Sequence, residues 1–281
     1  MVGKDATAGR TGQPGEGVEA WRLLDLSDAD PYINMAIEEA LMHSVGAGEA
    51  PPTLRLWQNQ NAVIIGYFQD AEVEADIEAC RALGTAVVRR VSGGGAVYHD
   101  PGNLNYALFL PLGSPRVPDD VMASYRLYCG AVIEALGILG LQAEFAPIND
   151  IVVGGRKVSG TAQARRWGAL LHHGTLMLHL DISMMARVLK VTREHLEKKG
   201  VKSVTERVAT LEQLGRPTTV AEAKAALVEG FSRTLGVAFQ PGELTPGERE
   251  LVRQLYRDKY GRPDWNLKRP ADARDDKGHL G

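Results

Sequence analysis

Apolar and polar positions along the chain follow two periods, and the changes of period predict a mixture of strands and helices. Short apolar runs predict strands at residues 21–26, 54–58, 62–67, 86–91, 96–98, 104–110 and 169–180. Amphipathic spacing predicts helices at residues 30–45, 72–83, 121–136, 182–189, 220–235 and 246–260, the first capped by Asp28 or Asp30. Because these elements keep no strict strand–helix–strand rhythm, they favour a mixed α/β or α+β layered fold.

The segment NDIVVGGRKVSGTAQ, residues 149–163, contains a hairpin signal. Gly154 and Gly155 have the character of a two-residue loop between strands. Counting outward from that loop places Asp150, Lys157 and Ser159 on one face, so a carboxylate and an ammonium lie diagonally about 7–8 Å apart at Cβ. The alternative is an ordinary surface ion pair, which contributes only ~0–1 kcal/mol.

The segment RRVSGGGAVYHD, residues 89–100, combines two arginines with three consecutive glycines. Such a run either permits positive φ in a turn or lets backbone N–H groups approach an anion. Arg89 and Arg90 offer a fork for phosphate or carboxylate, and period-two alternation puts Arg90 on the side of Ser92. Neither GxxxxGK[ST] nor a helix-opening GxGxxG is present. Ser92 lacks the strand-to-helix elbow GxSxG, and Ser159 has no base at a recognisable spacing, so a catalytic triad is unsupported.

Two adjacent histidines, His172 and His173, lie on the apolar run at residues 169–180 and point to opposite faces of the predicted strand. One of them is expected to be buried, where a hydrogen-bonded core role is the usual one and a ligand or catalytic role is the alternative. HExxH is absent, and neighbouring histidines on a strand cannot easily share one ion. The histidines therefore predict no zinc site.

The composition is that of an ordinary globular chain, with 44% apolar residues, 24% charged residues and a formal charge of −3, so no global attraction to nucleic acid or anionic membrane is expected. Cys80 and Cys129 lie in no metal-binding spacing, which fits a reducing cytoplasm. No signal peptide and no run of about 18 apolar residues is found, so no membrane span is expected. Residues 1–19 and 267–281 are predicted to be flexible tails.

The two long segments, together with HHGTLML at 172–178, resemble the lipoate–protein ligase A family of the biotin/lipoate protein ligase superfamily. The resemblance continues through VIIGYFQ at 63–69, VLKV at 188–191, KGVKSVTERVATL at 199–211 and YGRPDWN at 260–266. It implies one catalytic domain over residues 20–266, with mixed sheets flanked by helices. It also implies a reaction in two steps. Lipoate and Mg-ATP form lipoyl-AMP and pyrophosphate, and a lysine ε-amine of an acceptor then takes the lipoyl group as an amide.

The resemblance assigns roles residue by residue. Lys157 matches the lysine that contacts the acyl carbonyl and the phosphate of the adenylate, as an electrostatic anchor rather than a nucleophile. The nucleotide-binding positions that match are Arg90, Ser92, Gly94, Gly95, Ala96, Val97, Tyr98, Asn149 and Asp150, with Asp150 also the candidate Mg²⁺ ligand. The expected substrate contacts are Trp57, His99, Gly160, Thr161, His173 and Gly174. Leu41 and Ile65 are further candidates for an apolar acyl slot, with plain core packing as the alternative.

Two departures from the family bear on the activity. Transferase relatives that lack adenylation carry a cysteine nucleophile shortly before the Asn-Asp pair, whereas this chain reads EFAPIND there. That difference favours an ATP-dependent ligase over an octanoyl or lipoyl transferase between carrier proteins, and over a non-catalytic ligand-binding protein. Many family ligases also carry a further C-terminal domain. Its absence here leads us to expect either a separate accessory chain or a reduced form of the enzyme.

The expected acceptor is a lipoyl domain or an H-protein-like carrier that presents its lysine on a tight turn. Arg156, Arg165 and Arg166 are candidates for a basic surface that meets an acidic carrier, with solvated surface charge as the alternative. The sequence does not separate lipoate from octanoate as the acyl substrate.

Overall fold

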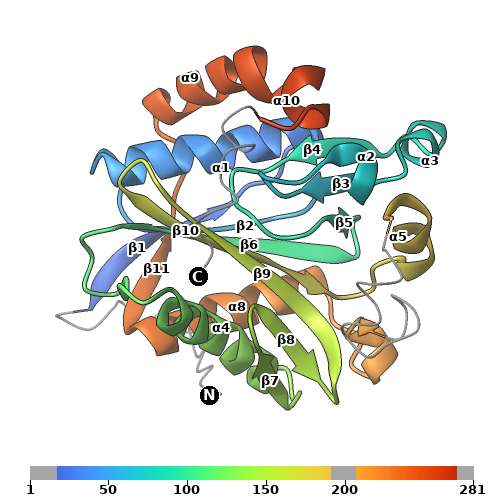
Figure 1. Cartoon of the computed structure of the whole chain (residues 1–281). Helices are drawn as coiled ribbons and strands as arrows, with labels where there is room; N and C mark the ends of the chain where they lie inside the picture. The colour runs from blue at the N-terminus through green and yellow to red at the C-terminus, as the bar shows by residue number, and fades with distance from the viewer. Residues whose placement is uncertain (1–17, 191–206, 271–281) are drawn as a thin grey trace, which may run out of the picture.

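The computed structural model describes residues 18–190 and 207–270, and the elements of these ranges form layers around two sheets (Figure 1). The larger sheet has the strand order β11 (Val237–Pro241), β1 (Glu19–Asp25), β2 (Thr53–Trp57), β6 (Asn103–Pro111), β10 (Ala169–Met177), β9 (Arg156–Arg166), β8 (Asp150–Val153) and β7 (Ala143–Ala146). The smaller sheet has the order β4 (Ala86–Arg89), β3 (Ala62–Ile65) and β5 (Val97–His99). Both sheets contain parallel and antiparallel neighbours, so the predicted mixed α/β fold is confirmed.

Helices cover both faces of the larger sheet (Figure 1). α4 (Val121–Ile138) and α8 (Val220–Leu235) lie on one face, and α1 (Pro31–Gly46) and α9 (Pro246–Leu255) lie on the other face together with the smaller sheet. The shorter helices are α2 (Ala71–Glu74), α3 (Ile77–Ala82), α5 (Ile182–Val188) and α10 (Pro263–Leu267), with a 3-10 turn at Glu212–Leu214 and a π turn at Tyr256–Tyr260. The larger sheet is therefore a central layer whose two faces have separate cores.

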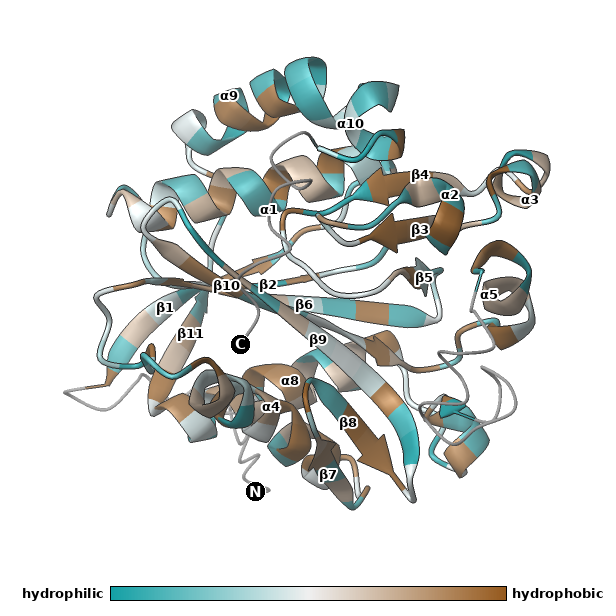
Figure 2. Cartoon of the chain, viewed as in Figure 1, coloured by the Kyte–Doolittle hydropathy of each residue, from teal (hydrophilic) through white to brown (hydrophobic). Residues whose placement is uncertain are grey.

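Side-chain alternation along the central strands produces these separate cores. On β6, Leu108 and Leu110 belong to the core against α4 and α8, whereas Ala107 and Phe109 belong to the core against α1. A third core lies on the far side of the smaller sheet, where β3 and β4 are hydrophobic along most of their length (Figure 2). Burial on both faces explains why these strands lack a clean polar alternation.

Two helix boundaries refine the predictions. The cap of α1 is Asp30, whose Oδ1 accepts a hydrogen bond of 2.8 Å from the Tyr32 N–H. The single helix expected at residues 72–83 is wrong, because α2 and α3 are separated at Ala75. Ala75 forms a bridge to Leu189, and the Asp76 side chain starts α3 by accepting from the Ala79 N–H.

Within the described ranges, α4 is the one helix whose length and mean hydropathy would suffice to cross a membrane. A core helix meets the same criterion as a membrane helix. The buried face of α4, with Tyr128, Val132 and Leu136, packs in the core beside α8. These contacts account for its apolar stripe.

The β8–β9 hairpin has the predicted loop and the predicted pairs next to that loop. Further from the loop, the register of the two strands differs from the prediction. Val152 pairs with Lys157 as expected, and both loop glycines have positive φ, 56° and 77°. A β-bulge then shifts the ladder, so Asp150 pairs with Gly160 rather than with Ser159. Ser159 is fully buried and bonds to the Tyr106 hydroxyl at 2.9 Å, so its expected place beside Asp150 is wrong.

The triple-glycine stretch does not join neighbouring strands. β4 and β5 lie on opposite sides of β3, so the chain from Arg90 to Ala96 crosses past the end of β3. The passage is tight, since a Cβ on Gly66 would lie 2.0 Å from the Gly94 carbonyl oxygen. Gly94 itself has a φ of 89°. Both positions therefore require glycine.

Candidate functional site

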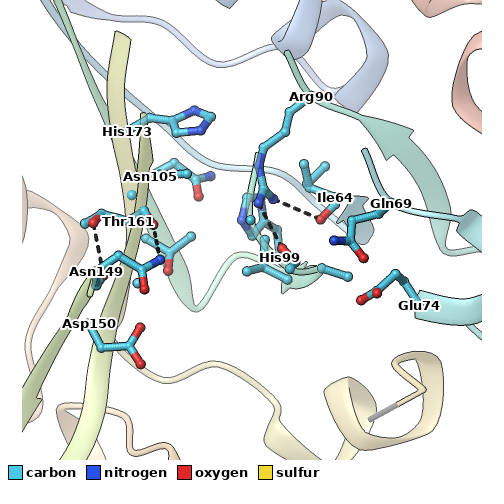
Figure 3. A pocket seen from close by; sticks show the side chains of 18 of the residues that line it. Ile64, Gln69, Glu74, Arg90, His99, Asn105, Asn149, Asp150, Thr161 and His173 are labelled. Carbon is cyan, nitrogen blue, oxygen red and sulfur yellow. Dashed lines mark hydrogen bonds between the residues drawn. The ribbon is translucent and has the colours of Figure 1, made fainter. Parts of the chain in front are cut away.

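A cavity of about 570 Å³ lies between the larger sheet and the glycine connection, a size typical of small-molecule sites (Figure 3). It brings together most of the residues predicted from the sequence: Trp57, Arg90, Gly94, Gly95, Ala96, Val97, His99, Asn149, Asp150, Lys157, Gly160, Thr161, His173 and Gly174. Its lining also includes residues that the sequence reasoning missed: Met35, Ile64, Gln69, Val73, Glu74, Asn105, Ala162, Thr175, Lys190 and Arg207.

A carboxylate held by two cations forms one end of the cavity. Lys157 Nζ lies 2.6 Å from Asp150 Oδ1, and Arg207 Nη2 donates to Asp150 Oδ2 at 2.7 Å. Burial raises the pKa of the Asp150 carboxyl, but the two cations outweigh that effect and the net pKa is lowered. Arg207 reaches this position because Val208 bridges to Lys157 and the Ala209 N–H donates to the Lys157 carbonyl oxygen. The cluster can exchange its internal pairing for contacts to an anionic ligand.

Gly160 makes room for the Lys157 side chain. A Cβ at this position would lie 2.4 Å from Lys157 Nζ and 2.6 Å from its Cε. The lysine therefore passes over the bare backbone of β9 to reach Asp150. Asn149 beside it donates from Nδ2 to the Thr161 carbonyl oxygen at 2.6 Å, so its position is also fixed by β9 (Figure 3).

The two arginines of the glycine stretch have different positions. Arg90 lines the cavity, while its guanidinium donates to the carbonyl oxygens of Gly93, Gly95 and Ile64. Burial lowers its pKa to about 10, which leaves it charged at neutral pH. Arg89 points the other way and donates to the carbonyl oxygens of the β3–α2 connection and α10. Only one arginine of the pair thus reaches the cavity, as period-two alternation predicts.

His173 lies in a hydrogen-bonded chain beside the cavity. Its Nδ1 is 2.9 Å from a Glu38 carboxylate oxygen, and its Nε2 is 2.7 Å from Ser92 Oγ, which also accepts from Arg90 Nε. This is a serine–histidine–carboxylate order, but Ser92 is 1% exposed and is not part of the cavity wall. The chain therefore holds Arg90 and His173 in place rather than presenting a nucleophile.

The other histidine of the pair belongs to the opposite face of β10. His172 is fully buried among Tyr106, Tyr125 and Tyr128, and burial lowers its pKa to about 3. Both histidines are thus buried, where one was expected. His172 has the core role.

Several predicted residues lie outside the cavity. The Tyr98 side chain faces the third core and donates to Asn61 Oδ1, which leaves only its backbone near the glycine connection. Leu41 and Ile65 are fully buried in the α1 core and the third core respectively, so of the three acyl-slot candidates only Trp57 lines the cavity. Ile64, the neighbour of opposite parity, takes the place expected for Ile65.

Neither cysteine is part of the cavity wall. Cys129 lies behind it, with Sγ 3.7 Å from Thr161 Oγ1, and burial raises the pKa of its thiol to about 11. Cys80 belongs to the third core, and burial raises the pKa of its thiol as well. Both thiols are therefore protonated at neutral pH, which makes them poor nucleophiles.

The acidic side chains of the described residues form no enclosed metal site. The described residues contain no cluster of three His, Cys, Asp or Glu side chains that could enclose an ion. The Asp150 carboxylate next to the Asn149 amide suits Mg²⁺ that takes its remaining ligands from phosphate and water. The predicted role of Asp150 thus depends on a bound nucleotide.

Comparison with known proteins agrees with this combination of fold and cavity. Residues 30–232 match the family described as the lipoyl protein ligase A/B catalytic domain, and the chain belongs to that family. A curated relative, octanoyltransferase LipM of Anoxybacillus flavithermus, is 34% identical, over 89% of this chain and 99% of its own length.

Two solved structures are similar over their whole length. One is described as a bi-partite lipoate protein ligase with its E2 lipoyl domain, from Thermoplasma acidophilum, with a TM-score of 0.81, 36% identity and coverage of 90% of this chain and 98% of that chain. The other is a lipoate-protein ligase A bound with ATP, with a TM-score of 0.79, 35% identity and coverage of 89% and 100%. Ligases and an octanoyltransferase are thus about equally similar to this chain, and overall identity does not distinguish the two reactions.

Proposed function

We propose that this protein is an ATP-dependent lipoate–protein ligase. In the first step a lipoate carboxylate oxygen attacks the α-phosphorus of ATP, forming the mixed anhydride lipoyl-AMP and releasing pyrophosphate. In the second step a lysine ε-amine of an acceptor domain attacks the acyl carbonyl. An amide forms, AMP leaves with the anhydride bond pair, and the amine loses a proton.

The observation that carries the proposal is the contrast between Lys157 and the thiols. A transferase without ATP needs a thiolate that can hold the acyl group, and no cysteine of the described residues lines the cavity. The stretch before the Asn-Asp pair, where transferase relatives have their nucleophile, supplies only EFAPI. A ligase that activates lipoate with ATP needs no acyl-enzyme intermediate. Its lysine contacts the acyl oxygen and the phosphate and stabilises the negative charge that develops as the carboxylate attacks the α-phosphorus.

The proposed roles follow the geometry of the cavity. Lys157 leaves Asp150 to contact the acyl oxygen and the α-phosphate. Asp150 and Asn149 are the residues that would hold a Mg²⁺ ion, which would supply Lewis-acid neutralisation of the phosphate charge. The backbone at Gly94, Gly95 and Ala96 lies against the nucleotide, on a connection that Arg90 fixes through its carbonyl contacts. His173 and Gly174 contact the acyl group from β10.

The acceptor that we propose is a lipoyl domain, a partner also named for the Thermoplasma ligase. That ligase is described as bi-partite, which supports a separate accessory chain for this protein as well. Arg156, Arg165 and Arg166, the candidates for a basic surface that meets an acidic carrier, do not lie together. Arg156 begins β9 and Arg166 ends it, so they lie roughly 30 Å apart along the strand. Arg165 donates to the Pro118 carbonyl oxygen at 2.6 Å, whereas the Arg166 guanidinium lies 4.2 Å from the centre of the Tyr67 ring, so these neighbours point to opposite faces of β9 and the three arginines form no single surface. A cytoplasmic location remains a prediction.

The LipM relative favours a second candidate, an ATP-independent octanoyltransferase that uses Cys129, whose Sγ lies 3.7 Å from Oγ1 of the cavity-lining Thr161. One experiment separates the candidates. The pure chain is incubated with a lipoyl domain and either lipoate, Mg²⁺ and ATP or an octanoyl carrier protein without ATP, each with and without a candidate accessory chain. The masses of acceptor and enzyme are then measured.

The ligase proposal expects an ATP-dependent gain of one lipoyl group on the acceptor, release of pyrophosphate, and the same result for Cys129→Ala. An acyl-enzyme that disappears in Cys129→Ala would establish the transferase. Tight binding of lipoate without pyrophosphate release or acceptor modification would establish a ligand-binding protein.

A further inference from the structure

Glu74 contributes a carboxylate to a cavity whose charged wall is mainly cationic. The lysine and arginine side chains that line it are Arg90, Lys157, Lys190 and Arg207. The other carboxylate of the wall, Asp150, is neutralised by its pairs with Lys157 and Arg207 at 2.6 and 2.7 Å. No described residue forms an ion pair or a side-chain hydrogen bond with the Glu74 carboxylate. Glu74 is therefore an unneutralised anion in this wall.

The backbone of Glu74 is held at the rim of the cavity. Ala71 and Ala75 of the same segment are fully buried in the third core, whereas Val73, which also lines the cavity, is 55% exposed. The Glu74 carbonyl oxygen accepts a hydrogen bond of 2.9 Å from the Lys190 N–H. α2 is thus anchored on one side and reaches solvent on the other, with the half-buried Glu74 at the boundary.

The Glu74 side chain faces the charged cluster across the cavity. In Figure 3 its carboxylate points from the side of α2 toward the strands that carry Asp150 and Thr161. The Asp150 carboxylate points into the same space from the opposite side. A molecule bound against β9 at Lys157 therefore has Glu74 on its other side, toward the rim.

A carboxylate at this place opposes the first proposed step and suits the second. Lipoate and ATP are both anions, and like charges at short range repel each other in a partly buried site. The acceptor lysine is the one substrate of the proposed reaction that arrives as a cation at neutral pH. Glu74 therefore attracts the nucleophile, whereas it contributes nothing to the binding of ATP.

We propose that Glu74 is the catalytic residue that receives the acceptor lysine. The proposal rests on the proposed function, because it requires bound lipoyl-AMP. Solvent at the rim takes one proton from the lysine ammonium, and the neutral amine donates a hydrogen bond to the Glu74 carboxylate. The nitrogen attacks the acyl carbon, the C–N bond forms, and AMP leaves with the electron pair of the C–O bond. The nitrogen passes its second proton to Glu74, which releases it to water.

The test separates the two half-reactions. The full chain, with the candidate accessory chain, receives synthetic lipoyl-AMP and a lipoyl domain, and the mass of the acceptor is followed through a single turnover. Glu74→Gln keeps the size of the side chain and removes its charge and basicity, so transfer should slow by about 100-fold or more. Lipoate-dependent pyrophosphate exchange should keep at least the wild-type rate, with an unchanged or lower KM for ATP, because a neighbouring anion has been removed.

Glu72→Gln is the matched control. Glu72 belongs to the same helix, is exposed and is not part of the cavity wall. This variant should keep both wild-type rates, and Glu74→Asp, which retains a carboxylate on a shorter side chain, should recover part of the transfer rate. Wild-type transfer in Glu74→Gln would overturn the proposal. An equal loss of transfer and exchange would overturn it as well, because a structural or ATP-binding role affects both steps.

The same measurements keep this proposal distinct from the proposed function. Transfer from supplied lipoyl-AMP that depends on Glu74, in a wild-type chain without pyrophosphate exchange, would reject adenylation alone. Exchange by the wild type, with a transfer step that is insensitive to Glu74→Gln, would reject the role of Glu74 alone. A wild-type chain that leaves the acceptor unmodified in the presence of lipoyl-AMP would reject both.

Discussion

Gly160→Ala should impair catalysis without destabilising the fold. The added Cβ would lie 2.4 Å from Lys157 Nζ and 2.6 Å from its Cε, both far below van der Waals contact. These atoms are the end of a flexible side chain, so the lysine moves aside and the β9 backbone stays in place. The movement takes the ammonium away from the position beside Asp150 where the substrate phosphate is proposed to bind.

The expected stability change is small because its contributions oppose each other. The pair between Lys157 and Asp150 is partly exposed, with side-chain exposures of 19% and 11%, so its loss costs at most about 1 kcal/mol. Replacing glycine by alanine at a backbone conformation that alanine tolerates recovers about 0.4–1 kcal/mol. Gly160 has no positive φ, so the two effects nearly cancel.

Gly174→Ala is the informative contrast, because it adds the same methyl group on the neighbouring strand. Its Cβ would lie 2.4 Å from the Tyr106 hydroxyl and 2.9 Å from the Gly160 carbonyl oxygen. Tyr106 is fully buried and bonded to Ser159, so it cannot move aside as a lysine can. Overpacking of this kind costs about 1–3 kcal/mol, or about 2–4 °C in Tm per kcal/mol for a chain of this size.

The assay combines thermal unfolding with lipoate-dependent exchange of pyrophosphate into ATP. Gly160→Ala should keep the wild-type Tm within about 2 °C and lose about 100-fold in kcat, the effect of misplacing one charged group by about 1 Å. Gly174→Ala should lower Tm. Wild-type kcat in Gly160→Ala would refute the positioning role of this glycine, and a fall in Tm like that of Gly174→Ala would show that the lysine is not free to move.

Two further predictions concern Lys157 and a buried ion pair elsewhere. Lys157→Ala should abolish lipoyl-AMP formation with little change in Tm, and wild-type pyrophosphate exchange in this variant would reject the adenylation role. Glu248 accepts two hydrogen bonds from Arg22, at 2.7 and 2.8 Å, and one of 2.6 Å from Ser44. Burial raises the pKa of the Glu248 carboxyl, but these donors outweigh it and the net pKa is lowered from 4.5. The stabilisation is therefore complete above pH 4.5 and is lost as pH falls through the lowered pKa. Glu248→Ala should cost about 3–5 kcal/mol at pH 7, and its difference from wild type in chemical denaturation should shrink below pH 4.5. A difference that does not change with pH would contradict this assignment.

Periodicity predicted the local elements because it reports which face of an element is buried. The strands around the cavity and the opposite orientations of His172 and His173 follow from spacing alone, and spacing narrowed the cap of α1 to Asp28 or Asp30, of which the structure has Asp30. The break between α2 and α3 does not, because it depends on the bridge from Ala75 to Leu189, more than a hundred residues later in the chain. Helical spacing cannot show a tertiary contact of that kind.

The predictions of site residues were likewise correct where they depended on local spacing and incomplete where they depended on tertiary contacts. Lys157 and Asp150 were paired by counting from a hairpin loop, and Arg90 was separated from Arg89 by parity. Arg207 and Asn105 were missed because tertiary contacts, rather than parity, bring them to the cavity: the bridge from Val208 to Lys157 for Arg207, and the order of strands for Asn105. Asn105 stands next to Thr175 and Trp57 only when β6 is placed between β10 and β2. Parity within a segment is a local property, whereas the order of strands in a sheet is not.

The β-bulge in β9 shows how one irregularity determines the chemistry of the site. In the unbroken register, Ser159 would face Asp150, and its side chain would occupy the space through which Lys157 passes. The bulge adds one residue between them, so Ser159 turns to the opposite core and bonds to Tyr106, while Gly160 takes the position opposite Asp150. The lysine then crosses a strand with no side chain in its way and reaches the carboxylate at 2.6 Å. The simple hairpin count therefore found the correct ion pair but missed the glycine that makes the pair possible.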